Sequence, residues 1–354
     1  MISNRKKLRW IRVHQLFDTP DEGPNFLSNE LRYIDWDYYP RSPFPDTFRP
    51  NKLVVLKLGY SLQEELWKGY KGDHQFSFRL QPPFPLLKNS LQKLVLNDFY
   101  WQDEEISNDI GQLANLLRLN LCYNRFTRIH FSLSQLTRLK HLDQSNCTLL
   151  VEVPELPTRL AFFRADDCEK LTSMGDSYKK CKWLCQVSLI EGGIINDGNR
   201  LLESMLQGNG IENKNMVLQL QGFKNAMEIA LFTGDGCRLK LSENWRNDFS
   251  GFLICTLSYI GITSVSMKLV MESDMQSEDN KACKESTERL VVWYISFDSL
   301  RHNTPTWWKS INNAYSISFK ANSSGNYCYG IGVRLVARKN GAGPTEILTL
   351  KKNL

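Results

Sequence analysis

Short runs of regularly spaced apolar residues recur through the first half of this 354-residue chain and limit what it can fold into. Each run carries an apolar residue at its first, fourth and sixth positions, as Leu53, Leu56 and Leu58 do. This spacing places three apolar side chains on one face of a short strand, and a single run cannot bury that face alone. We therefore expect several such units to stack into a solenoid.

The spacing of the runs identifies the kind of solenoid. Successive starts lie 22, 38, 25, 23 and 21 residues apart, and four of these intervals match the leucine-rich-repeat length of about 20–29 residues. We predict a leucine-rich-repeat domain with a curved parallel sheet over residues 31–175, after an N-terminal lead-in over 1–30. The long interval indicates an insertion over about 72–90. The predicted starts are Leu31, Leu53, Leu91, Leu116, Leu139 and Leu160.

The repeat pattern weakens toward residue 175 and a different pattern follows. Gln144 and Ala165 occupy third apolar slots of the last runs. After a connector over 176–215, alternating residues predict several short strands, which favour an antiparallel sandwich or jelly roll over 216–340, followed by a tail over 341–354. A hairpin is expected at Thr233–Gly236. The nearly uncharged stretch 252–271 is interpreted as two strands and not as a membrane span. The predicted fold class is thus an α/β leucine-rich-repeat solenoid followed by an all-β antiparallel domain.

Composition argues against several classes of function. The 44 Lys and Arg residues against 38 Asp and Glu are too balanced for a nucleic-acid-binding protein. The five histidines are dispersed, and the Cys181 and Cys185 pair lacks a second pair to complete a zinc site. We expect no metal, no cofactor and no enzymatic activity. The basic N-terminus has no apolar run typical of a signal peptide, and the nine cysteines suit a reducing compartment, so we expect a cytoplasmic or nuclear location.

Particular residues around the repeats carry a family resemblance. They are Trp36, Tyr39-Pro40, Phe44-Pro45, Phe48, Leu66-Trp67-Lys68-Gly69, Gly251–Cys255 and Cys328–Val336. With these residues the chain resembles the C-terminal portion of plant TIR-type nucleotide-binding leucine-rich-repeat disease resistance proteins. That portion holds the repeats and a post-repeat jelly-roll or Ig-like domain. The chain departs from the family's full pattern, because it contains no G-x-x-x-x-G-K-[ST] phosphate-binding motif and no TIR domain.

The resemblance implies a recognition module in plant innate immunity. Such a module senses a pathogen effector or a modified host protein through the concave face of the repeats and the loops of the sandwich. Two alternatives remain open: a scaffold or decoy partner of intact resistance receptors, and a carbohydrate-binding or enzymatic β-sandwich. The residues between the apolar slots should face the concave side, where they would contact a protein partner. They are Tyr33, Asp35, Lys57, Tyr60, Lys93, Asn97, Arg118, Asn120, Tyr123, His141, Asp143 and Arg164, with Trp307 and Trp308 as a possible contact in the sandwich.

Overall fold

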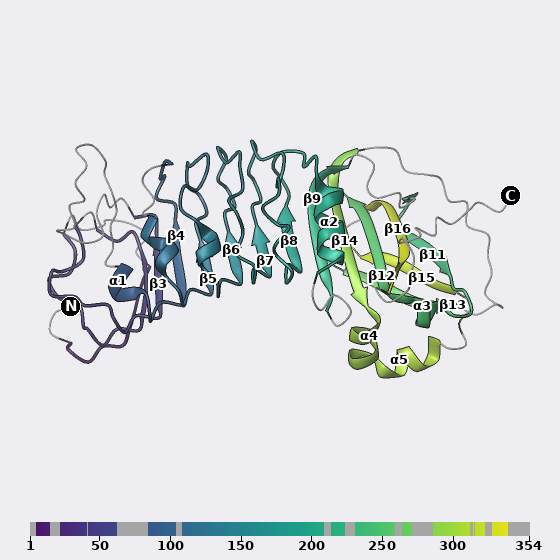
Figure 1. Cartoon of the computed structure of the whole chain (residues 1–354), viewed down its shortest axis with the longest axis horizontal. Coiled ribbons are helices and arrows are strands. Elements are labelled where there is room, and N and C mark those ends of the chain that lie inside the picture. The colour runs from purple at the N-terminus through teal and green to yellow at the C-terminus, as the bar shows by residue number, and fades with distance from the viewer. Residues whose placement is uncertain are drawn as a thin grey trace. The chain divides into compact units, whose positions relative to one another are not determined.

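The chain forms two compact units in the computed structural model (Figure 1). The N-terminal unit spans Met1–Leu184 with Glu191–Gly193, and the C-terminal unit spans Cys185–Ile190 with Ile194–Leu354. The structure describes residues 5–14, 22–40, 42–61, 84–103, 108–208, 214–223, 231–258, 264–270, 286–311, 314, 316–322 and 328–338.

A parallel sheet forms the frame of the N-terminal unit, and its strands pair in the order of the chain. Figure 1 shows β3 to β7 side by side. This arrangement confirms the predicted solenoid of stacked coils. The strands are β1 (Trp10–His14), β2 (Tyr33–Asp37), β3 (Val55–Gly59), β4 (Lys93–Asn97), β5 (Arg118–Asn120), β6 (His141–Asp143) and β7 (Phe162–Arg164), and the helical turns are α1 (Phe84–Leu87), η1 (Asn108–Gln112) and η2 (Leu133–Gln135).

The register of this sheet aligns equivalent repeat positions on neighbouring strands. Ile34 is paired with Leu56, Leu56 with Leu94, and Leu94 with Leu119. These four side chains are almost completely buried, as are the leucines at the first repeat position. Stacking therefore buries the apolar face that one repeat would leave exposed to water.

Two strands lie where the sequence reading placed no repeat. β1 belongs to the stretch interpreted as a lead-in, and its Ile11 and Val13 take the fourth and sixth positions of a repeat. β8 (Gln186–Leu189) lies in the stretch interpreted as a connector, with Val187 and Leu189 in the same positions. Ile or Val replaces leucine at two of the three apolar slots of the β1 run and at one slot of the β8 run, and the leucine spacing therefore did not mark them.

The ninth repeat position ties neighbouring coils together by hydrogen bonds. The buried Asn124 amide donates to the carbonyls of Leu96 and Leu121, and its oxygen accepts from the Trp101 N–H. In the next two repeats the position is held by Cys147 and Cys168, whose thiols donate to backbone carbonyls at 3.3 Å. Burial raises the pKa of both thiols to about 12, so they remain neutral donors.

The C-terminal unit contains two groups of strands. One has the order β8-β9-β14-β12-β16-β10 and is antiparallel except for the pairing of β8 with β9, and the other is antiparallel with the order β11-β15-β13. Its other elements are α2 (Gly198–Leu206), β9 (Met216–Phe223), β10 (Phe232–Thr233), β11 (Gly236–Lys240), α3 (Trp245–Asp248), β12 (Phe249–Ser258), β13 (Ser264–Val270), β14 (Ser286–Ser296), α4 (Phe297–Asn303), α5 (Pro305–Ser310), β15 (Ser316–Asn322) and β16 (Cys328–Ala337).

One apolar cluster receives side chains from both groups of strands. Phe252 of β12 lies 5.4 Å from Phe319 of β15, measured between ring centroids, and Trp245 and Phe297 pack against Phe252. All four side chains are buried. This cluster is the core of the C-terminal unit.

Among the described residues, the two strands that flank the turn expected at Thr233–Gly236 do not pair with each other, and residues 227–230 of the expected hairpin lie outside the described part of the chain. β10 pairs with β16, whereas β11 pairs with β15, so the turn leads from one group of strands to the other. Gly234 has φ of +116°, a conformation that favours glycine, and this is the turn signal that suggested a hairpin. A turn signal fixes the local reversal of the chain but not the partners of the two strands.

The remaining sequence predictions fall partly outside the described residues. Residues 72–83 of the predicted insertion and the whole of the predicted tail 341–354 lie outside them. Within the stretch 252–271 the described residues belong to β12 and β13. No helix among the described residues has the length and apolar character needed to span a bilayer.

Gln144 should be a site where the repeat core can be improved. Its side chain is fully buried at the sixth repeat position, and neither amide atom has a hydrogen-bond partner among the described residues. Since an unsatisfied buried amide costs about 1–3 kcal/mol, Gln144→Leu is expected to raise the free energy of unfolding by about that amount. Urea denaturation measures the change, with Gln92→Leu at an exposed position as the control. A lower free energy of unfolding for Gln144→Leu would contradict this account.

Candidate recognition surface

The strands β1 to β7 present one exposed side, which we call the ladder face. It consists of the first and third residues of each strand and the fifth residue of each five-residue strand, because the second residues are buried in the core. We include in it the tyrosines that follow β2 to β5, namely Tyr38, Tyr60, Tyr100 and Tyr123. The register places Lys93, Arg118 and His141 in one row across β4, β5 and β6. A second row contains Asp35 and Lys57 on β2 and β3. Residues far apart in the sequence thus become neighbours at the spacing of adjacent strands, about 4.8 Å.

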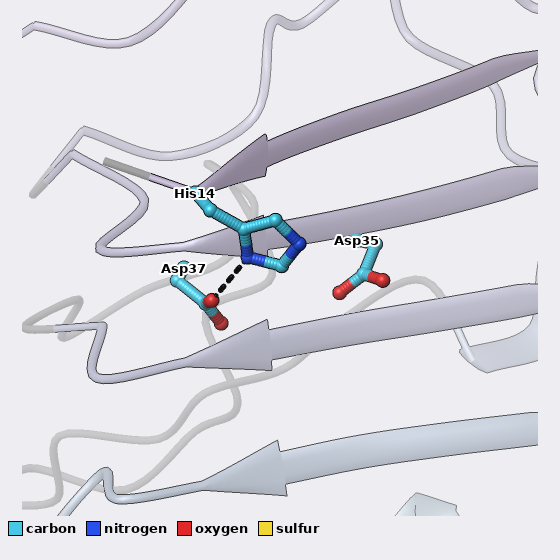
Figure 2. Close-up of side chains that lie close together, drawn as sticks. All are labelled: His14, Asp35 and Asp37. Atoms are coloured by element: carbon cyan, nitrogen blue, oxygen red, sulfur yellow. Dashed lines mark hydrogen bonds and ion pairs between the residues drawn. The ribbon is translucent and has the colours of Figure 1, made fainter. Parts of the chain in front are cut away.

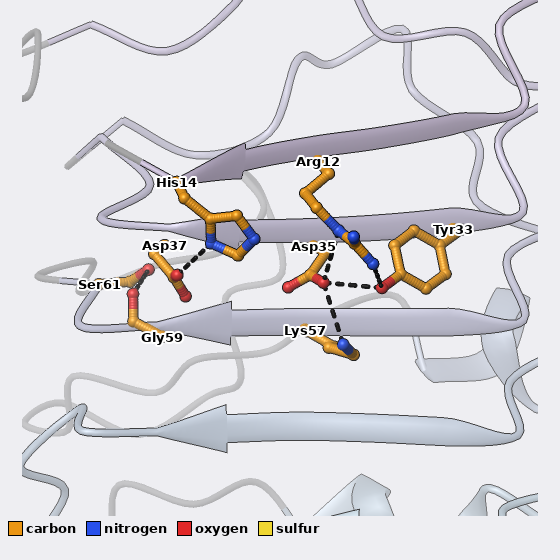
Figure 3. Close-up of polar contacts among 8 residues, drawn as sticks. All are labelled: Arg12, His14, Tyr33, Asp35, Asp37, Lys57, Gly59 and Ser61. Carbon is orange, nitrogen blue, oxygen red and sulfur yellow. Dashed lines mark hydrogen bonds and ion pairs between the residues drawn. The ribbon is translucent and has the colours of Figure 1, made fainter. Parts of the chain in front are cut away.

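Asp35 is the centre of a polar cluster on β1 to β3 (Figure 3). Its Oδ2 accepts hydrogen bonds from the Tyr33 hydroxyl at 2.7 Å and from Lys57 Nζ at 3.0 Å, and Arg12 Nε lies 3.3 Å away. Arg12 Nη2 also donates to the Tyr33 hydroxyl at 3.0 Å. Burial acts to raise the pKa of Asp35, but the hydrogen bonds from Tyr33 and Lys57 outweigh it and lower the pKa. Asp35 is therefore an ionised, largely buried group that holds three neighbouring side chains.

His14 and Asp37 lie beside this cluster. Figure 2 shows the His14 ring directed at Asp37, with the dashed contact from Nδ1 to a carboxylate oxygen. Ligand atoms of His14, Asp35 and Asp37 lie within 4.8 Å of one another, a spacing that a metal ion could bridge. Arg12 and Lys57 already neutralise Asp35. The arrangement is accordingly that of an ion-pair network on the ladder face.

A repeated backbone feature ends the ladder strands. The eighth residue of each of the six repeats that start at Leu31 to Leu160 has a left-handed conformation, with φ of 54° at Tyr38 and Tyr60 and 58° at Tyr123. Positive φ is unfavourable for a bulky residue. Here each of these N–H groups donates to a backbone carbonyl of the next coil, as Tyr38 does to Gly59 at 2.8 Å and Tyr123 to Ser145 at 3.0 Å. The ladder hydrogen bond stabilises the conformation and fixes where the side chain lies.

Four tyrosines at or near this position form what we call the tyrosine rim: Tyr38, Tyr60, Tyr100 and Tyr123. The rings of Tyr38 and Tyr60 stack with centroids 5.0 Å apart, and Arg125 lies over the ring of Tyr100 at 4.8 Å. Tyr60, Tyr100 and Tyr123 are 42%, 51% and 49% exposed. Burial and the charge of Asp98 raise the pKa of Tyr60, and Asp98 raises that of Tyr100. The hydroxyls of Tyr60 and Tyr100 therefore remain protonated.

The residues predicted for the repeats lie on the ladder face or directly after its strands. Tyr60 and Tyr123 belong to the rim, and Asn97 ends β4 beside Gly59. Asp35 is only 6% exposed, so it fixes the side chains of its neighbours and is not accessible to a protein partner. The other predicted positions on the face are Tyr33, Lys57, Lys93, Arg118, Asn120, His141, Asp143 and Arg164.

Several ladder-face residues escaped the sequence reading. Arg12 and His14 lie on β1, which was not recognised as a repeat strand. Tyr38 occupies the eighth repeat position, as Tyr60 does, and counting positions from the repeat start would have found it. Tyr100 lies two residues after the eighth position of its own repeat, and the repeat spacing does not mark that position.

The two tryptophans predicted as a possible contact differ in their surroundings. Trp308 is buried in the core of the C-terminal unit, where it packs against Trp245 and Phe297. Trp307 is partly buried and packs against the same core. Trp308 is therefore a core residue, and a flat platform of two exposed rings is not formed.

Comparison with known proteins relates the chain to plant disease resistance proteins. TMV resistance protein N of Nicotiana glutinosa is 24% identical over 278 residues, which are 72% of this chain and 23% of that protein. Disease resistance protein RPP2A of Arabidopsis thaliana is 26% identical over 159 residues, 44% of this chain and 9% of that protein. Disease resistance protein RRS1 of the same plant is 37% identical over 59 residues, 17% of this chain and 5% of that protein.

These relatives confirm the resemblance that the aromatic residues of the first repeats indicated. The chain spans about a quarter of the length of resistance protein N and a smaller share of the other two. No family model matches the sequence.

The Asp35 cluster should contribute to stability in a pH-dependent way. Because its pKa is lower in the folded chain than in the unfolded chain, ionised Asp35 stabilises the fold above about pH 4 and loses this effect as the pH falls. Asp35→Asn is expected to lower the free energy of unfolding by about 1.5–3 kcal/mol at pH 7, in line with hydrogen bonds to a charged group, and by much less at pH 3.

Chemical denaturation at the two pH values measures this difference. Glu30→Gln, which removes an exposed ion pair with Lys52, is the matched control and should leave unfolding unchanged at both. An equal loss of stability at pH 7 and pH 3 for Asp35→Asn would show that the carboxylate charge is not responsible.

Proposed function

We propose that this homologue of plant disease resistance proteins is a non-enzymatic protein-recognition module that acts in plant defence. The partner would be a pathogen effector or a host protein that an effector has modified. The observation that carries the proposal is the tyrosine rim, because exposed tyrosines held on a rigid backbone are typical of binding hot spots.

The rim has the physical properties that a protein contact requires. Tyrosine buries a large apolar ring and retains a hydroxyl that can donate a hydrogen bond. The stacking of Tyr38 on Tyr60 and the ladder hydrogen bonds of their backbones fix the side chains before binding. Little conformational freedom would then be lost on association, which favours affinity.

The polar cluster next to the rim supports the same function. Asp35 fixes Arg12, Tyr33 and Lys57, and the exposed parts of these side chains surround a largely buried carboxylate. Fixed charges at the border of a contact surface contribute specificity more than affinity. The rim and the cluster together would form an apolar centre with a charged border.

For the C-terminal unit we propose the post-repeat sandwich that the sequence resemblance implied. The two groups of strands and their common apolar cluster support this assignment. Its loops would add contacts to the same partner. We further propose that the chain works in the cytoplasm or the nucleus, where effectors delivered into plant cells are met.

Partner capture in plant tissue tests the proposed function. The tagged chain is expressed in leaves with and without the pathogen, and proteins recovered with it are identified by mass spectrometry. Replacing Tyr60 and Tyr123 together with alanine should weaken the recovered complex by at least about 30-fold, as expected from hot-spot losses of 2 kcal/mol or more. Leu86→Ala removes another exposed apolar side chain of the N-terminal unit and should leave binding unchanged.

The outcomes separate recognition from the alternatives. Equal binding by the tyrosine variant and the wild type would show that the ladder face is not the contact surface. Specific recovery of an intact resistance receptor in the absence of the pathogen would instead favour the scaffold or decoy function. No enriched protein, together with an unchanged immune response when the gene is removed, would contradict both.

A further inference from the structure

A row of basic side chains on the ladder face includes two cations, Lys93 and Arg118, that have no negative partner among the described residues. Lys93, Arg118 and His141 are paired in register on β4, β5 and β6. Among the described residues, neither Lys93 nor Arg118 forms a side-chain hydrogen bond or an ion pair. The cations of the Asp35 cluster, by contrast, each contact a carboxylate.

Neighbouring basic side chains in the row repel one another. Burial, followed by the charges of Lys57 and Arg118, lowers the pKa of Lys93. Burial, followed by Arg118, Lys140 and Lys93, lowers the pKa of His141. Folding therefore holds these groups close together against their mutual repulsion. A negative group placed over the row would relieve this repulsion.

An aromatic group continues the row on the next strand. The ring of His141 stacks on that of Phe162 of β7, with centroids 4.2 Å apart and an angle of 3° between the planes. The stack orients the imidazole on β6, next to Arg118 in the row. The register therefore places three side chains with donor groups on neighbouring strands, with their backbones about 4.8 Å apart.

From this geometry we propose that Lys93, Arg118 and His141 bind a short acidic segment of the partner protein, with at least two carboxylates over the row. The inference rests on the proposed function, since it specifies the chemistry of the partner at the same face. Arg118 would hold a carboxylate by two parallel hydrogen bonds, whereas Lys93 would act as a point charge.

A protein segment fits the surroundings of the row better than a nucleic acid does. The adjacent row contains the carboxylates of Asp35 and Asp143, and the row beyond it contains that of Asp37. A continuous phosphate backbone that crossed the face would meet these charges, whereas a peptide can place its carboxylates only where cations lie.

Binding of a defined acidic peptide tests the inference without knowledge of the partner. Fluorescently labelled hexaglutamate is titrated with the full chain by fluorescence anisotropy at low ionic strength, with hexaglutamine as the neutral probe. We expect hexaglutamate to bind and hexaglutamine not to bind. The charge-reversal variant Lys93→Glu/Arg118→Glu should weaken hexaglutamate binding at least about ten-fold, since it removes two charge-assisted contacts.

A matched variant separates the row from the overall charge of the chain. Lys170→Glu/Lys182→Glu changes the net charge by the same amount at exposed positions outside the row, and it should retain binding. Equal loss in both variants would overturn the inference, and so would the absence of hexaglutamate binding to the wild-type chain. Tighter binding of a single-stranded RNA of equal charge through Lys93 and Arg118 would replace the peptide with a nucleic acid.

A second variant and a partner-capture experiment separate loss of folding from loss of binding, and the acidic-segment inference from the proposed function. Should the charge-reversal variant fail to fold, Lys93→Gln/Arg118→Gln removes the same repulsion and should fold at least as stably as the wild type. A partner whose capture depends on Tyr60 and Tyr123 but not on Lys93 and Arg118 would leave the proposed function standing and overturn the acidic-segment inference alone.

Discussion

The parallel backbone ladder of the N-terminal unit is the constraint on which the other features depend. Its register aligns the buried side chains of Ile34, Leu56, Leu94 and Leu119, so each coil completes the core of its neighbour. The same ladder accepts the N–H groups of the eighth repeat residues and thereby stabilises their left-handed backbone. A surface feature such as the tyrosine rim is therefore a direct consequence of how the core is stacked.

The ladder face has two regions, which differ in whether a carboxylate of the chain contacts their cations. Around Asp35 the cations are held by a carboxylate within the chain, which makes that region a fixed part of the structure. Across Lys93 and Arg118 the positive charge meets no carboxylate among the described residues. Both arrangements follow from the repeats, because the repeats align the outward positions of neighbouring strands irrespective of the residue types there. Differences in these outward residues can therefore change the surface without changing the fold.

The repeat spacing was sufficient to predict the solenoid and the outward positions, because alternation in a strand decides which side chains face the core. It missed β1 and β8, in whose runs Ile or Val replaces leucine at one or two of the three apolar slots. It also could not show that Asp35 would be buried beneath its partners, or that the strands on either side of Gly234 would join different sheets. Those features depend on contacts between distant segments, and spacing along the chain carries no information about them.

Side-chain footprinting of the chain with its captured protein partner tests the central claim, that the ladder face is the recognition surface, most directly. Hydroxyl radicals modify exposed aromatic side chains, so Tyr60, Tyr100 and Tyr123 should be modified in the free chain and protected in the complex. Trp183, which is 44% exposed outside the ladder face, should react equally in both. Protection confined to the C-terminal unit, with the three tyrosines still reactive, would contradict the claim.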